Sequence, residues 1–383
     1  MSTGRDSRCT APVGENLDFL AGRRILSHFD RLPRAVAWKF FSGVALLFFV
    51  FSATSPLAAD DIFRIVKVAD GVYAAIAKPT FRLNCNAAII VQDDGVVVVD
   101  SESIPSAARE VITAIKRITD KPVKYLVITH FHGDHFQGAQ AYLSEWPGVQ
   151  VISSDATRGS IAKRGIPRMD RETLGLPARI ENLKADLQRA NDEKEKAQIQ
   201  KNLEQAEAYF SELKEVQGIL PSVTVDHELT LHSKSHTVQI MWLGLAHTDG
   251  DLFVYVPDAR VMITGDALHS GTPTMTDAFP YEWIQTLNTA ETFDFDAVIG
   301  GHGDVMHGKA MFELWKQFLT DLMAGVAKVG ASGGTLAEAR QTLAPTLIVK
   351  YGPKFESIPA PFSQTVYANI DIAFRIVCGR LVQ

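Results

Sequence analysis

Short apolar runs recur along the chain and predict β-strands. The largely apolar runs Gly95–Asp100, Val123–Ile128 and Val261–Asp266 predict buried strands, and the alternating run Thr237–Leu243 predicts another. Ala297–Ile299 predicts a short strand. Helical patterns of polar and apolar residues lie between and after these runs. Because strands alternate with helical stretches, the pattern predicts an α/β layered fold rather than a sandwich of antiparallel strands alone.

A helical insertion is predicted at about residues 177–217. This segment is rich in Glu, Lys, Ala, Leu and Gln, and its apolar residues have the three-and-four spacing of two amphipathic helices joined near Asn191. We expect the two helices to pack as a hairpin against each other or against the body of the protein. The alternative is a lid or a dimer surface beside the functional site.

The chain after His307 predicts a helical C-terminal extension. Helical patterns cover residues 310–329, 335–343 and 363–377, and the glycine-rich run 330–334 separates the first two. We expect these helices to cover the sheets of the preceding domain. The chain then divides into residues 1–59, a layered domain at 60–308 and the extension at 309–383.

The segment THFHGDH carries four side chains that can bind a metal. In an extended stretch, His130 and His132 project to the same side. Gly133 lets the backbone turn, so that Asp134 and His135 can point to a second position nearby. Imidazole and carboxylate ligands without thiolate suit zinc, iron or manganese at a catalytic site, whereas structural zinc sites usually recruit several cysteines.

Three residues at the ends of predicted strands complete a ligand set. His247 would be the third histidine of a first metal. His302 would join Asp134 and His135 at a second metal. Asp266 is the candidate bridge, because its two carboxylate oxygens can bind two cations. The joint appearance of these residues, in this order, predicts a two-metal hydrolytic site.

These motifs resemble those of the metallo-β-lactamase-fold hydrolase superfamily. The resemblance rests on THFHGDH, GLAHTDGD, ITGDALH and GGHGD and on the strand that ends at Asp100, and it covers roughly residues 66–307. It implies a four-layer αββα sandwich with a dinuclear site at one edge, between two half-domains. It also implies the ligand sets His130, His132 and His247 on one metal, Asp134, His135 and His302 on the other, and Asp266 between them.

Five residues near this set each have two interpretations. Asp100 matches a residue that supports the ligands in relatives, and the alternative is a helix N-cap or turn carboxylate. His269 either contacts the substrate or supports a metal ligand, or it is an ordinary surface histidine. Tyr281 and Trp283 line the pocket or belong to the core. Cys85 faces the substrate or is a small packing residue.

The resemblance indicates a reaction more clearly than a substrate. True β-lactamases of the superfamily usually carry Cys or Ser where this chain has Asp266, whereas thioesterases of the glyoxalase II type, lactonases and phosphodiesterases carry the bridging Asp. We expect an exported dinuclear zinc hydrolase acting on a small ester, thioester, lactone or lactam, with iron or manganese as alternative metals. The other interpretations are a β-lactamase, a mononuclear iron sulfur dioxygenase and a non-catalytic metal-binding module.

A reaction at such a site needs no serine or cysteine nucleophile. Two cations lower the pKa of a shared water, so that hydroxide is available at neutral pH. One cation would polarise the substrate carbonyl, and the other would stabilise the leaving group. Asp134 is the candidate catalytic residue, because its carboxylate could handle a proton as well as bind metal.

Residues 1–59 have the pattern of a targeting segment. An apolar stretch at residues 40–51 follows basic residues and precedes small residues that end near Ala59, as in a cleaved secretory signal. The alternative is an uncleaved membrane anchor, because residues 40–59 approach the ~20 residues of a membrane-spanning helix. We therefore expect a periplasmic or secreted protein, or one anchored to the membrane and facing the periplasm.

The charge of the chain restricts its possible partners, and its cysteine content restricts the possible disulfides. The chain has a net charge of −6, and removal of residues 1–59 would leave −9. An acidic body without a basic stripe is a poor nucleic-acid binder, so we expect a small-molecule substrate. The sequence leaves open whether Cys85 and Cys378 pair, and it does not give the oligomeric state.

Overall fold

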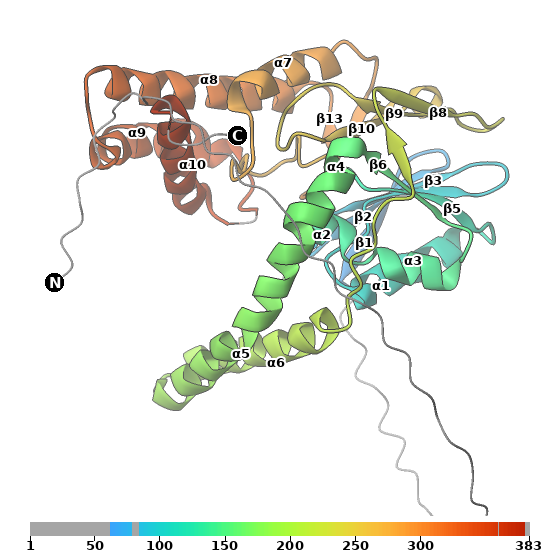
Figure 1. Cartoon of the computed structure of the whole chain (residues 1–383), viewed down its shortest axis with the longest axis horizontal. Helices are drawn as coiled ribbons and strands as arrows, with labels where there is room; N and C mark the ends of the chain where they lie inside the picture. The colour runs from blue at the N-terminus through green and yellow to red at the C-terminus, as the bar shows by residue number, and fades with distance from the viewer. Residues whose placement is uncertain (1–61, 79–83, 359, 380–383) are drawn as a thin grey trace, which may run out of the picture. The chain divides into compact units, whose positions relative to one another are not determined.

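Two β-sheets form the centre of the protein (Figure 1). The computed structural model describes residues 62–78, 84–358 and 360–379. In this part of the chain, the first sheet has the seven strands β1 (Phe63–Ala69), β2 (Val72–Ala77), β3 (Ala87–Val91), β4 (Val96–Val99), β5 (Val123–Val127), β6 (Gln150–Ser154) and β7 (Val223–Val225), side by side in chain order. The second sheet has six strands, in the spatial order β13 (Met306–His307), β12 (Ala297–Gly300), β11 (Val261–Gly265), β10 (Leu252–Val256), β9 (Val238–Trp242) and β8 (Glu228–Leu231).

Strand direction explains why distant segments meet at one edge. β4, β5 and β6 run parallel to one another, and β11 runs parallel to β12. Neighbouring parallel strands end at the same edge of their sheet. The segments that follow β4 and β5, with Asp100 and His130, therefore lie next to each other. The segments that follow β11 and β12, with Asp266 and His302, do the same in the second sheet.

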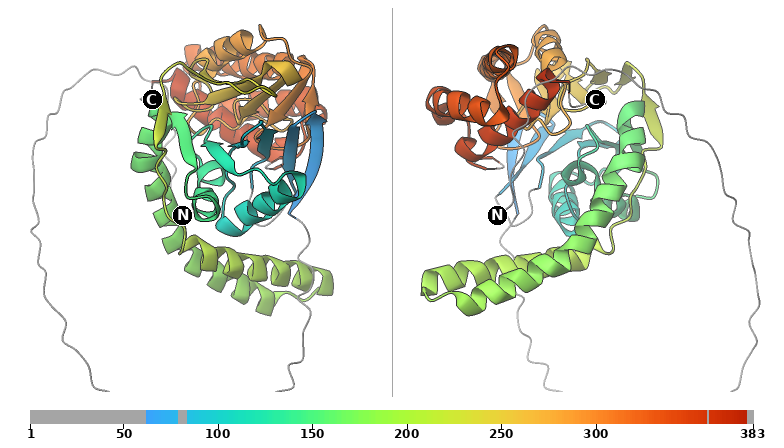
Figure 2. Two further views of the ribbon diagram at one scale, coloured as in Figure 1. Left: turned by 90° about the vertical axis from the view of Figure 1, so that its right-hand side faces the viewer. Right: turned by 60° about the vertical axis from the view of Figure 1, so that its left-hand side comes forward.

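Helices cover the outer face of each sheet (Figure 2). α1 (Pro105–Ile118) and α3 (Ala139–Glu145) pack on the first sheet, and α7 (Pro280–Ala290) and α8 (Ala310–Ala331) pack on the second. Separate apolar clusters lie between each sheet and its helices, and a further cluster lies between the two sheets. The four-layer αββα sandwich expected from the sequence is confirmed.

β4 shows why a buried strand is an unbroken apolar run. Val96 and Val98 face α1 and its layer, whereas Val97 and Val99 face the second sheet. All four side chains are buried. A strand that is covered on both faces favours apolar side chains throughout. β11 is also buried at every position, and its one polar side chain, Thr264, donates a hydrogen bond to the carbonyl oxygen of Leu268.

A helical hairpin is inserted between β6 and β7. It begins with α4 (Asp155–Ser160) and a π-helical segment (Ile161–Gly165), and continues as α5 (Ile166–Arg189) and α6 (Glu193–Leu213). α5 and α6 pack against each other through two apolar clusters, as expected. Figures 1 and 2 show the hairpin extending away from the sheets. The expected start at Pro177 is wrong for the helix, because Pro177 lies inside α5.

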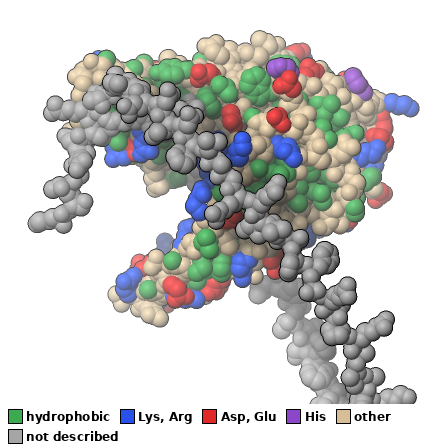
Figure 3. All heavy atoms as spheres, in the orientation of Figure 1, with side chains coloured by type: hydrophobic (Ala, Val, Ile, Leu, Met, Phe, Trp, Pro, Cys, Tyr) green, Lys and Arg blue, Asp and Glu red, His purple; other side chains and the backbone are tan. Residues whose placement is uncertain are grey.

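The surface of the hairpin carries both signs of charge. Ion pairs at a spacing of three residues join Lys184 to Glu181 and Arg189 to Asp186. Lys184 also pairs with Glu207 across the two helices. Figure 3 shows acidic and basic side chains intermixed over this region. Such pairs are typical of a solvated helical face and add little stability individually.

The C-terminal extension forms α8, α9 (Leu336–Tyr351) and α10 (Phe362–Val377). α8 and α10 lie close to the predicted bounds, whereas the predicted end of the second helix at residue 343 is wrong, because α9 continues through Pro345 to Tyr351. α9 begins with a capping box in which Thr335 and Glu338 bind each other's backbone amides. α8 packs on the second sheet, and α9 and α10 pack against α8. The expected covering role of these helices is confirmed.

No helix of the described part of the chain is long and apolar enough to cross a membrane. The targeting segment predicted at residues 1–59 lies outside the described residues. The choice between a cleaved signal and a membrane anchor therefore stays a prediction.

Candidate metal centre

The seven predicted ligand residues meet at the edge where β5, β9, β11 and β12 end. The THFHGDH segment supplies four of them, from the loop after β5 and from α2 (Gly133–Phe136). Within each of two groups, one donor atom per residue lies within 4.8 Å of the others. The first group is His130, His132, His247 and Asp266, and the second is Asp134, His135 and His302. The structure therefore assembles both sets that the sequence predicted.

Asp266 lies between the two groups and divides its oxygens between them. Oδ2 is 3.7 Å from Nε2 of His247 and 4.0 Å from Nε2 of His130. Oδ1 is 3.3 Å from Nε2 of His302 and 3.4 Å from Nε2 of His135. Each oxygen thus faces a different pair of imidazoles, which is the arrangement expected of a carboxylate that bridges two cations.

Partners behind the rings fix the orientation of two of these histidines. Nδ1 of His135 lies 2.8 Å from Oδ2 of Asp100. Nδ1 of His247 lies 3.0 Å from the carbonyl oxygen of Thr274. A ring that is held at Nδ1 keeps Nε2 free to face a metal.

Asp100 supports the centre from an unusual backbone position. Its φ of 67° lies in the left-handed region that few residues other than glycine adopt. Oδ1 accepts a hydrogen bond of 2.8 Å from the backbone amide of Thr129, while Oδ2 faces His135. Asp100 is not a helix N-cap, because Ile104 holds that position for α1. The supporting role implied by the resemblance therefore matches its contacts.

His132 faces its group with Nδ1 and is held at Nε2, the reverse of His135 and His247. Its Nδ1 lies 2.9 Å from Nε2 of His247, so Nδ1 is the nitrogen that faces the first group. Its Nε2 lies 2.8 Å from Oδ2 of Asp277. Asp277 was missed by the sequence analysis, because nothing in the spacing of the loop before α7 relates it to His132.

The donor atoms fit a cation. Nε2 of His130, Nε2 of His135 and Oδ1 of Asp266 are buried and have no hydrogen-bond partner within the described residues. A buried polar atom without a partner costs stability. One cation at each group would satisfy all three, because Nε2 of His130 belongs to the first group, whereas Nε2 of His135 and Oδ1 of Asp266 face the second. Imidazole and carboxylate donors suit zinc, iron or manganese.

The two groups carry different charges. Burial, with the nearby His132, lowers the pKa of His247 to about 4, so the ring is neutral near pH 7, the form that binds metals. Burial also opposes charge on His302, but Asp266 and Asp134 outweigh it and raise the pKa of His302 to about 9. The first group therefore offers a neutral imidazole, whereas the second holds a positive charge beside its carboxylates.

A cavity of about 250 Å³ opens onto both groups and is lined by His132, Asp134, Asp266, His269, Thr274, Thr276 and His302. A second cavity, of about 230 Å³, shares His132 and Asp134 with the first. Its other walls include Phe131, Arg168 and Met169, from the THFHGDH segment and the beginning of α5. The centre thus has room for a small molecule beside the donor atoms.

The structure decides between the two interpretations of the nearby side chains. His269 is 1% exposed and lines the first cavity, so the alternative of a surface histidine is wrong. Trp283 belongs to the core, where its Nε1 donates to the carbonyl of Ala267 and its ring packs on His247. Tyr281 is half exposed and lines neither cavity.

Cys85 is a buried, free thiol, so it does not pair with Cys378. Burial raises the pKa of Cys85 well above its usual value, and the nearby Asp100 and Glu102 add to this effect. The sulfur is therefore protonated at neutral pH. A protonated, enclosed thiol matches the expectation of a small packing residue.

Asn86, next to this thiol, joins the rims of the two sheets. Its Nδ2 donates to the carbonyl oxygens of Gly300 and Gly303, at 3.0 and 2.8 Å. Its Oδ1 accepts a hydrogen bond from the amide of Ala77 in β2. The loop that carries His302 is thereby fastened to the first sheet.

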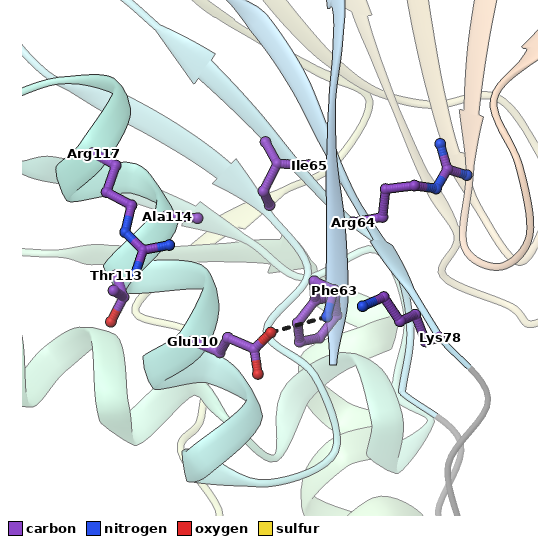
Figure 4. Close-up of a pocket in the computed structure, with 8 residues that line it drawn as sticks. All are labelled: Phe63, Arg64, Ile65, Lys78, Glu110, Thr113, Ala114 and Arg117. Atoms are coloured by element: carbon purple, nitrogen blue, oxygen red, sulfur yellow. Dashed lines mark hydrogen bonds between the residues drawn. The ribbon is translucent and has the colours of Figure 1, made fainter. Parts of the chain in front are cut away.

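A larger cavity, of about 450 Å³, lies between β1 and α1 and contains none of the predicted ligands (Figure 4). In this view Arg64 and Arg117 lie on opposite sides of β1, and Glu110 accepts a hydrogen bond from the amide of Phe63. Arg64 pairs with Asp304. The charged side chains do not converge on one point, so chemistry rather than size identifies the functional site.

Comparison with known families supports this assignment. The sequence model described as the metallo-beta-lactamase superfamily matches residues 80–302. This match covers more than half of the chain and includes all seven candidate ligands. The protein therefore belongs to the metallo-beta-lactamase superfamily.

Curated relatives with hydrolase names match parts of the chain. The linear primary-alkylsulfatase of Pseudomonas sp. (strain ATCC 19151) is 22% identical over 255 residues, which are 62% of this chain and 44% of that protein. The hydroxyacylglutathione hydrolase of Prochlorococcus marinus (strain MIT 9312) is 34% identical over 85 residues, or 22% of this chain and 32% of that protein. The matches thus span less than half the length of these relatives.

Solved structures that are similar to this chain include a metallo-beta-lactamase from Pontibacter korlensis. It is 17% identical, covers 68% of this chain and 99% of its own, and has a TM-score of 0.49. The metallo-beta-lactamase DIM-1 is 15% identical, covers 68% of this chain and 97% of its own, and has a TM-score of 0.46.

Proposed function

We propose that this protein is a metal-dependent hydrolase with two divalent cations, which act on an ester-like bond of a small molecule. The position of Asp266, with one oxygen toward each imidazole group, carries this proposal. His130, His132 and His247 would hold the first cation, and Asp134, His135 and His302 the second. Zinc is the proposed metal, and iron or manganese would suit the same donors.

When bound, such cations make hydroxide available near neutral pH and polarise the substrate oxygen. The protein's own residues supply the remaining functions. Asp134 lines both cavities, and its Oδ2 lies 3.3 Å from Nε2 of His302. Because Oδ2 faces His135 and His302 and would bind the second cation, we assign the other carboxylate oxygen of Asp134 to accept a proton during the reaction. His269, in the wall of the first cavity, is assigned to contact the substrate.

The substrate class is proposed from the site and from the names of the relatives. The cavities of about 250 and 230 Å³ suit a small molecule. Two of the relatives carry the names linear primary-alkylsulfatase and hydroxyacylglutathione hydrolase. A test panel should therefore contain a thioester, an alkyl sulfate, a simple ester, a lactone and a lactam.

The test compares hydrolysis of this panel by the zinc-loaded protein and by two histidine variants. His132→Ala removes a candidate ligand, whereas His227→Ala removes an exposed imidazole that belongs to neither ligand group. We expect turnover of at least one substrate by the wild type and by His227→Ala, and its loss in His132→Ala. Equal rates in all three proteins would refute the proposal.

Metal analysis separates the alternative functions. Two equivalents of zinc per chain support the hydrolase, whereas a single iron with oxygen-dependent turnover of a persulfide would support the dioxygenase. Metal binding without turnover of any panel substrate would support a non-catalytic module. The two donor groups on either side of Asp266 favour two cations over one.

We also propose that the protein is exported. The support is the apolar stretch at residues 40–51, which basic residues precede and small residues follow. Expression in a bacterium and sequencing of the mature N-terminus would test this proposal. A new N-terminus near residue 60 in the periplasmic fraction is expected, whereas an intact chain in the cytoplasm would contradict it.

A further inference from the structure

The ring of His132 is connected to the helical hairpin through one carboxylate. Asp277, in the loop before α7, places Oδ2 2.8 Å from Nε2 of His132. The carboxylate is buried, with 7% of its side chain exposed. It lies behind the ring, on the side away from the nitrogen that faces His247.

Two arginines from the base of the hairpin hold this carboxylate. Arg168, in the first turn of α5, donates from both terminal nitrogens to the two oxygens of Asp277, at 2.7 and 2.9 Å. Arg164, in the π-helical segment, also donates to Asp277. A forked, bidentate pair of this kind fixes the direction of a carboxylate as well as its charge.

The same arginines also contact the chain next to His132. The guanidinium carbons of Arg164 and Arg168 lie 4.2 and 5.1 Å from the centre of the Phe131 ring. Contacts of a guanidinium with an aromatic face are attractive. The base of the hairpin therefore touches both Phe131, the residue before His132, and the carboxylate behind the His132 ring.

We propose that Asp277, held by Arg164 and Arg168, is a positioning residue that orients the His132 ring toward the first cation. The base of the hairpin thereby supports a ligand of the metal centre. This inference rests on the proposed two-metal function. It gives the insertion a role beyond packing, because its first helical turns support a ligand.

The physical reason is the choice of ring nitrogen. Nδ1 of His132 faces the first group, so a metal there requires its lone pair, and the ring proton must lie on Nε2. A carboxylate that accepts this proton's hydrogen bond selects that tautomer and stops rotation of the ring. A buried carboxylate needs compensating charge, which the two arginines provide.

The experiment measures cation affinity by zinc titration of the full chain in competition with a chromophoric chelator, together with thermal unfolding. The variants are Asp277→Asn, Asp277→Ala, Arg168→Ala and Arg168→Lys. Asp371→Asn is the matched control, because Asp371 also accepts two hydrogen bonds from one arginine, Arg340, but belongs to α10 and contacts no candidate ligand.

We expect Asp277→Ala to weaken the binding of one of the two zinc ions about 10- to 100-fold, the range for residues behind a metal ligand. Asp277→Asn should have a smaller effect, because its amide oxygen can still accept from Nε2. Arg168→Lys should bind zinc more tightly than Arg168→Ala but less tightly than the wild type, because it keeps the charge and loses the fork. Asp371→Asn should leave both affinities unchanged.

Unchanged zinc affinities in Asp277→Ala and Asp277→Asn, with a fall in unfolding temperature like that of Asp371→Asn, would overturn the inference and leave only a structural ion pair. The wild type must bind two zinc ions for the proposed function to stand. Failure of the wild type to bind zinc would refute both that function and this inference. Two zinc ions in the wild type with unchanged affinities in the Asp277 variants would refute the inference alone, so the two failures are distinguishable.

Discussion

The two donor groups of the metal centre differ in what holds them. In the first group, residues outside the ligand set hold two of the rings by hydrogen bonds: Thr274 holds His247, and Asp277 holds His132. In the second group, Asp100 holds His135 in the same way, whereas the partners of His302 at Nε2 are carboxylates of the set itself, Asp134 and Asp266. The scaffold therefore orients both His247 and His132 of the first group, whereas in the second group His302 depends on attraction to other members of the set. Asp266 is the residue common to both.

The largest effect is expected from Asp266→Ala, which removes the shared carboxylate. Both cations should bind more weakly, and the hydrolytic rate should fall by more than the ~100-fold typical of residues behind a ligand. Zinc content and turnover of the panel substrate measure the effect. Retention of two tightly bound zinc ions would contradict the bridging position of Asp266.

Removal of one histidine from each group separates the groups. We expect His247→Ala and His302→Ala each to retain about one zinc equivalent instead of two, because each loses a ligand of one cation only. Metal analysis after gel filtration gives the number. Loss of both equivalents in either variant would show that the groups are more tightly coupled than their separate partners indicate.

The pH dependence of stability should also separate the groups in chelator-treated protein. The pKa of His302 is raised from 6.5 to about 9, so its stabilising contribution is fully present below pH 6.5 and is lost as pH rises through about 9. The pKa of His247 is lowered to about 4, so this ring destabilises the fold as pH falls from 6.5 toward 4.

Thermal unfolding between pH 4 and 10 measures both effects. The wild type should lose stability toward each end of the range. His302→Gln should reduce the alkaline slope without abolishing it, because the pKa of His135 is also raised: burial opposes charge on this ring, but Asp100, Asp266 and Asp134 outweigh it. An identical alkaline slope in wild type and His302→Gln would contradict the assignment of that slope to His302.

The smallest effect is expected from Cys85→Ala. The thiol is buried and protonated, and we assign it no part in binding, so zinc content and turnover should stay at wild-type levels. Stability should fall by about 1 kcal/mol, as for an average point substitution. A large loss of turnover at unchanged zinc content would instead give this thiol a functional role.

The sequence predicted the parts of the centre whose signal is local. Val96–Val99 is an unbroken apolar strand and Val261–Gly265 is a largely apolar one, and a ligand or supporting carboxylate follows each of them directly. The spacing within THFHGDH separates the two groups without knowledge of the fold. His247, Asp266 and His302 were predicted because each follows a recognisable strand.

The parts that could not be predicted depend on contacts between distant segments. Asp277, Arg164 and Arg168 come from a loop and from the base of the hairpin, more than 100 positions apart, as in the Arg168–Asp277 separation of 109. No periodic pattern in the sequence relates these three residues to one another. The beginning of α5 was also missed, because Pro177 suits a helix start, yet here burial of Met169 and Leu176 keeps the helix continuous across it.

Asn86 has a mechanical consequence for the reaction. Its amide joins backbone carbonyls of one sheet to a loop of the other, directly beside the turn that carries His302. Hinge opening of the sandwich at this rim would first have to break those bonds. We therefore expect access to the cavities through movements of loops and side chains rather than through separation of the two sheets at this rim.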